Sequence, residues 1–121
     1  MDESRVLLVA GIVLLSTSAL LGFVQERHRD SPEAFAHWRV VHAGGAGGAV
    51  QLLALAAVWH QFGASGWKGM IAWGVILASW AFFLGPLARA MGMPAASRAI
   101  NIAGAIVAAP SYLLLPVLVA G

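Results

Sequence analysis

The sequence predicts an all-α integral membrane protein, built as an antiparallel four-helix transmembrane bundle. Of its 121 residues, 60% are hydrophobic and only 10% are charged, whereas a soluble domain has about 25% charged residues. The charges leave four uncharged runs, at residues 6–24, 40–59, 69–88 and 99–121. Each run has about 20 residues and reaches about 30 Å as a helix, which is the thickness of a bilayer core.

The four helices are expected at residues 6–24, 33–59, 68–88 and 98–120 of a single domain, residues 1–121. The first run is longer than the apolar region of a signal peptide and follows acidic residues, so it is expected to be a retained helix. Ser31-Pro32-Glu33 is typical of a helix start, with Ser31 as the N-cap. The connections at 60–68 and 89–98 are short, which favours antiparallel neighbours.

Charge and cysteine content exclude several classes of function. The chain has no cysteine, which excludes disulfides, thiolate-bound iron–sulfur clusters and cysteine nucleophiles. Seven scattered basic residues against five acidic ones do not form a nucleic-acid footprint, so no nucleic-acid partner is expected. Most arginines lie in the first and third connections, which favours a cytoplasmic position for these loops in an inner or plasma membrane.

Few groups inside the spans can carry chemistry. The titratable ones are His42 and Tyr112, and ionisable groups within a span are functional candidates by default. His42 shares a helix face with Gly45, Ala46 and Ala49 at spacings of three, four and seven residues. Such a face suits a flat ligand fixed by one imidazole, as haem is. It equally suits an interfacial histidine beside a small-residue packing seam, and the spacing alone leaves both interpretations open.

The fourth span has a second polar stripe. Asn101, Gly104, Ala108 and Tyr112 lie on one face, and Pro110 between them removes a backbone donor and predicts a kink. The stripe could serve a site, or it could be a kinked packing helix with one hydrogen-bonded asparagine.

Short motifs in three spans resemble the styrene oxide isomerases, and the four-helix plan is shared by the related hydroxylaminobenzene mutases. Ser31-Pro32-Glu33 with Trp38-x-x-x-His42-x-Gly44 resembles the start of the family's second helix. Val75-Ile76-Leu77 with Trp80 resembles its third helix. Asn101 followed by Ala109-Pro110-x-Tyr112-Leu113 resembles its fourth helix. The resemblance spans most of residues 31–115.

The resemblance implies a cofactor, a reaction and an assembly. It implies a homotrimer in the lipid bilayer that binds haem b between subunits, with His42 as the ligand of the iron. Ferric iron would act as a Lewis acid on a small apolar epoxide, and ring opening with a hydride shift would give an aldehyde. The expected cofactor-binding residues are His42, Gly45, Ala46, Ala49 and Trp38. The expected catalytic residues are Asn101 and Tyr112.

Three positions depart from the family pattern. Gly48 replaces an asparagine, Pro86 replaces a tyrosine, and Asn101 replaces an acidic residue. The first two changes remove polar groups that line the family's substrate pocket. Two alternatives therefore stand beside the isomerase: a haem-binding sensor, carrier or accessory subunit, and an accessory membrane subunit without a cofactor.

Overall fold

The structure, a computed structural model, describes residues 2–120, and these residues form helices and turns. The long helices are α1 (Glu3–Arg27), α2 (Pro32–Val58), α3 (Lys68–Ala90) and α4 (Pro94–Ala120), and the short 3₁₀ turn η1 (Trp59–Gln61) follows α2. Each of the four long helices is long and apolar enough to cross a membrane. The predicted all-α fold with four spans is confirmed for this part of the chain. Met1 and Gly121, the ends of the predicted domain, lie outside the described residues.

The helices extend beyond several of the predicted bounds. α4 begins at Pro94 rather than at residue 98, because the fixed φ of proline suits the first position of a helix. α2 begins at Pro32 with Ser31 at the N-cap position, as predicted, although the Ser31 side chain makes no capping hydrogen bond. α1 begins after Asp2, whose carboxylate accepts a hydrogen bond from the Ser4 N–H at 2.9 Å.

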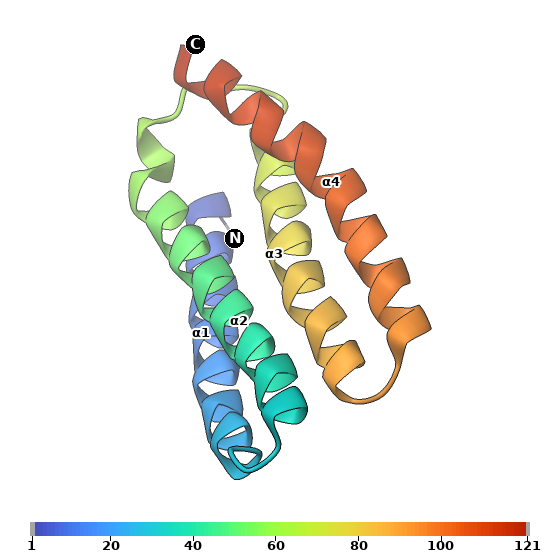
Figure 1. Cartoon of the computed structure of the whole chain (residues 1–121). Coiled ribbons are helices and arrows are strands. Elements are labelled where there is room, and N and C mark those ends of the chain that lie inside the picture. Colours follow the sequence, from blue (N-terminus) through green and yellow to red (C-terminus); the bar gives the residue numbers. More distant parts are fainter. Residues whose placement is uncertain (1, 121) are drawn as a thin grey trace.

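The helices pack as two pairs joined through their middle members. α1 lies along α2, α4 lies along α3, and α2 contacts α3. Figure 1 shows the α1–α2 and α3–α4 connections at one end and the α2–α3 connection with the end of α4 at the other. At that second end, the Gly63 N–H donates to the Leu118 carbonyl at 3.1 Å. α3 is the central helix, because 50% of its apolar stretch is buried against 22% in each of the others.

Small residues set the close approach of α3 and α4. A methyl group on Gly85 would overlap the side chain of Asn101, and one on Gly74 would overlap Ser111. Small residues in membrane helices allow backbones to approach closely in this way. α4 continues through Pro110, and the Ser111 hydroxyl donates to the Val107 carbonyl at 2.8 Å.

Candidate functional site

His42 is fixed to α1 by two reciprocal hydrogen bonds. Its Nδ1 lies 2.7 Å from the Ser18 carbonyl, and the Ser18 hydroxyl donates to the His42 carbonyl at 2.6 Å. A carbonyl oxygen can only accept, so Nδ1 carries the hydrogen and Nε2 of the neutral ring keeps its lone pair. The ring also packs against Gly22, where a Cβ atom would come within 3.2 Å of the His42 Cε1.

The free nitrogen of His42 is available to a ligand. Nε2 makes no hydrogen bond within residues 2–120, and it is not buried. His42 is half-buried, so Nε2 lies at the surface of the α1–α2 pair and within a span. Histidine ligands of metals are commonly oriented by such a bond from the other ring nitrogen to a carbonyl. His42, oriented by Ser18, therefore fits a ligand of haem iron.

Protein side chains alone would not complete a metal site here. Among the described residues, no group of three or more His, Asp or Glu side chains could hold a metal ion. An iron ion on His42 would need most of its other ligands from elsewhere, and a porphyrin supplies them with its own ring nitrogens.

The face of α2 that carries Gly45 and Ala49 is covered by neighbouring helices. A Cβ atom on Gly45 would lie 2.7 Å from Cδ2 of Phe83 and 2.9 Å from Cβ of Ser18. Ala49 is fully buried, and Ala46 is half-buried. The structure thus uses Gly45 and Ala49 for helix packing. Close to His42 in the sequence, the exposed small residues of α2 are Ala43, Gly44 and Gly47.

Trp38 lies one turn before His42 and contacts the end of α1. Its ring stacks on the ring of His28, with centroids 5.7 Å apart and planes inclined by 23°. His28 is itself held by a 2.8 Å contact between its Nδ1 and the Val24 carbonyl. This stack closes the α1–α2 pair near the first connection.

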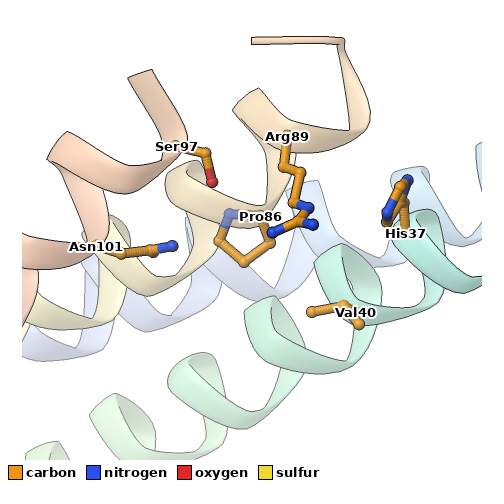
Figure 2. Close-up of a pocket in the computed structure, with 6 residues that line it drawn as sticks. All are labelled: His37, Val40, Pro86, Arg89, Ser97 and Asn101. Carbon is orange, nitrogen blue, oxygen red and sulfur yellow. The ribbon is translucent and has the colours of Figure 1, made fainter. Parts of the chain in front are cut away.

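Asn101 borders a polar cavity between α2, α3 and α4. The cavity has a volume of about 360 Å³, and Figure 2 shows the residues that line it: His37, Val40, Pro86, Arg89, Ser97 and Asn101. The side chain of Asn101 lies over Gly85, in space that any larger residue at position 85 would fill. His42 does not line this cavity.

Tyr112 occupies a third place, deeper along α4. It is eleven residues from Asn101, about 16 Å along the helix. Its half-buried ring packs against the core, and its hydroxyl faces Ser79 and Gln51. The Ser79 hydroxyl is buried and has no hydrogen-bond partner among the described residues. Gly48 adjoins it, since a Cβ atom there would lie 3.4 Å from the Ser79 Cβ.

One chain therefore does not bring the predicted site residues together. His42 is held against α1, Asn101 lies at the polar cavity, and Tyr112 faces Ser79 and Gln51. Sequence reasoning missed Ser18 and Gly22, the two residues that position His42. Their spacing of four residues places them on one face of α1. Nothing in the spacing could show that His42, 24 residues after Ser18, packs on that face.

A comparison with protein families gives a match over almost the whole chain. The family model described as styrene oxide isomerase matches residues 3–121, a range that includes His42, Asn101 and Tyr112. Neither a comparison with curated proteins nor one with solved structures gives a match.

Proposed function

Because the chain belongs to the styrene oxide isomerase family, we propose that it is a haem-b-dependent membrane isomerase that acts on a small apolar epoxide or aromatic compound. The observation that carries this proposal is the geometry of His42. Its Nδ1 is engaged by the Ser18 carbonyl at 2.7 Å, which leaves Nε2 for an iron ion. The family supports isomerase chemistry, and this histidine supports the haem.

The chain's own residues would act on the cofactor by holding it. When bound, haem would supply a Lewis acid for the epoxide oxygen. His42 would bind it through Nε2, and the Ser18 carbonyl would fix the tautomer and the orientation of the imidazole. The surrounding apolar helices would exclude water and so disfavour hydrolysis of the epoxide.

We propose that three copies assemble as a homotrimer of antiparallel four-helix bundles. The separation of the candidate residues within one chain supports this, since Nε2 of His42 is at the surface while Asn101 and Tyr112 lie on α4. A neighbouring copy could bring its α4 towards His42, where the amide and the phenol would orient the substrate. The measured mass of the detergent-solubilised protein tests the assembly, and a monomer would contradict it.

The membrane and its orientation follow from the charges. We propose an inner or plasma membrane, with the α1–α2 and α3–α4 connections on the cytoplasmic side, because most arginines lie in or next to these connections. Labelling of single cysteines introduced into each connection, in intact cells, tests this orientation.

A haem-binding protein without isomerase activity is the second candidate function. It is favoured by Gly48 and Pro86, which offer no polar side chain beside Ser79 or in the polar cavity. Incubation of the haem-loaded protein with styrene oxide, and measurement of the aldehyde formed, separates the two candidates. Aldehyde formation above a haem-only control supports the isomerase. Haem binding with no conversion of styrene oxide or other small aryl epoxides supports the second candidate.

A further inference from the structure

Two adjoining cavities surround the first turns of α4. The polar cavity already described shares Arg89, Ser97 and Asn101 with a second one of about 490 Å³. We call the two together the α4 cavity. The second cavity is lined by Arg89, Pro94, Ser97, Arg98, Asn101, Ile102 and Ala105.

The α4 cavity is positively charged without compensation. Arg89 and Arg98 line it, and no aspartate or glutamate does. Neither arginine forms an ion pair within residues 2–120, where the salt bridge that is present joins Arg29 to Glu26. Two unpaired guanidinium groups beside one cavity attract an anion, and they favour one with several oxygen atoms.

Ser97 adds a hydroxyl donor to the same cavity. The residue is only 4% exposed, yet it lines both parts of the cavity, so its hydroxyl, which makes no side-chain hydrogen bond within residues 2–120, opens on the cavity. Figure 2 shows this hydroxyl pointing from α4 towards α3. A serine hydroxyl that opens on a cavity and has no protein partner can donate to a ligand there. The positive end of the α4 dipole lies in the same place.

The depth of the cavity indicates the kind of anion. Arg89 directly follows the uncharged run 69–88, and Arg98 directly precedes the run 99–121, which places both at a membrane–water boundary. Ile102 and Ala105 continue the wall into the apolar region, and Ile102 is 55% exposed. A cavity that is charged at the boundary and apolar below it matches a phospholipid, whose phosphate is followed by acyl chains.

We propose that the α4 cavity binds the phosphate group of an anionic phospholipid, with an acyl chain lying along Ile102 and Ala105. Arg89, Arg98 and Ser97 donate to the phosphate oxygens. Free phosphate shares this chemistry but has no apolar part to place against Ile102. This site does not include His42, although it shares Asn101 with the residues proposed to orient the substrate. Lipid retention is measured without haem, so failure of the lipid proposal and failure of the proposed isomerase are distinguishable.

Native mass spectrometry of the full-length protein tests the proposal. The protein is purified in a mild detergent and mixed with equal amounts of phosphatidylglycerol and phosphatidylcholine that have the same acyl chains. The variants are Arg89→Gln/Arg98→Gln and Ser97→Ala, and the matched control is Arg39→Gln. Arg39 is an exposed arginine near the same end of the bundle that does not line the cavity. Helix content by circular dichroism confirms that each variant is folded.

We expect the wild-type protein to retain phosphatidylglycerol in preference to phosphatidylcholine. The double variant should lose this preference by about tenfold or more, since each basic group near a membrane surface contributes about 1 kcal/mol to binding an anionic lipid. Ser97→Ala should weaken retention less, and Arg39→Gln should leave it unchanged. If the double variant aggregates, Arg98→Gln alone provides the comparison.

Three results would overturn the proposal. The first is equal retention of the two lipids by the wild-type protein. The second is an equal loss in Arg39→Gln, which would mean that surface charge alone attracts the lipid. The third is a rise in the thermal unfolding temperature on addition of inorganic phosphate, in a protein that shows no preference for phosphatidylglycerol. That result would identify a soluble anion as the ligand.

Discussion

Replacing Gly45 with alanine adds one methyl group at the point where α1, α2 and α3 meet. The new Cβ atom would lie 2.7 Å from Cδ2 of Phe83 and 2.9 Å from Cβ of Ser18. Carbon atoms in favourable contact are about 3.5–4.0 Å apart. Phe83 is 1% exposed and Ser18 is fully buried, so neither side chain can swing into free space. The helices must therefore move apart.

The expected cost can be measured against a control on the same helix. Extra atoms in a packed core cost about 1–3 kcal/mol. At Gly47, two residues further along α2, a Cβ atom would meet nothing within 4 Å. Both substitutions change the helix propensity of the backbone equally. The difference in free energy of unfolding between Gly45→Ala and Gly47→Ala should therefore be about 1–3 kcal/mol, with Gly45→Ala the less stable.

Unfolding by sodium dodecyl sulfate in mixed micelles, followed by circular dichroism, provides the assay. The haem content of the two variants is a second readout, because Ser18 makes both hydrogen bonds that fix His42. We expect Gly45→Ala to retain less haem than Gly47→Ala. Equal unfolding midpoints for the two variants would refute the packing of α2 between α1 and α3 described above.

Three further predictions concern the fold. Gly74→Val should destabilise the protein by about 1–3 kcal/mol in the same unfolding assay, because the added side chain overlaps Ser111 between α3 and α4; an unchanged midpoint would argue against this contact. The pKa of Asp2 is held below its ordinary value of 3.8 by the hydrogen bonds that its carboxylate accepts in the first turn of α1. The capping hydrogen bonds are therefore present above pH 3.8 and lost as the pH falls through the lowered pKa. Amide hydrogen exchange in the first turn of α1 should accelerate over that pH range, and Asp2→Asn should abolish this pH dependence. Lys68→Met should cost about 1 kcal/mol and speed hydrogen exchange in residues 62–67, because the Lys68 ammonium donates to the Phe62 carbonyl at 2.9 Å.

The spans of this fold could be predicted because a membrane imposes a length and an apolar composition on each helix. The ends of the helices depend on single residues at each boundary, and several of the predicted end residues differ from the observed ones. The sequence predicts a short connection over residues 89–98 that includes Pro94, although a proline with a spanning run behind it is also typical of a first helical position. The structure begins α4 at this residue, which lines the second part of the α4 cavity.

The candidate site could be predicted only in part. His42 stood out because ionisable groups within a span are rare. Periodicity placed Gly45 and Ala49 on its face but could not show what covers that face, and the structure buries both residues against other helices. The pairing of His42 with Ser18 and the position of Asn101 over Gly85 depend on which helices become neighbours. No local pattern in the sequence determines that choice.

The haem-to-protein ratio of His42→Ala, compared with the wild-type protein and with His60→Ala, tests the central claim most directly. His42 is the histidine inside a span whose Nδ1 bonds a carbonyl of another helix and leaves Nε2 free, whereas His60 is exposed beside the α2–α3 connection. We predict a Soret band in the wild-type protein and in His60→Ala. His42→Ala should lose most of its haem while its helix content is kept. Full haem content and an unshifted Soret band in His42→Ala would contradict the assignment of His42 as the haem ligand.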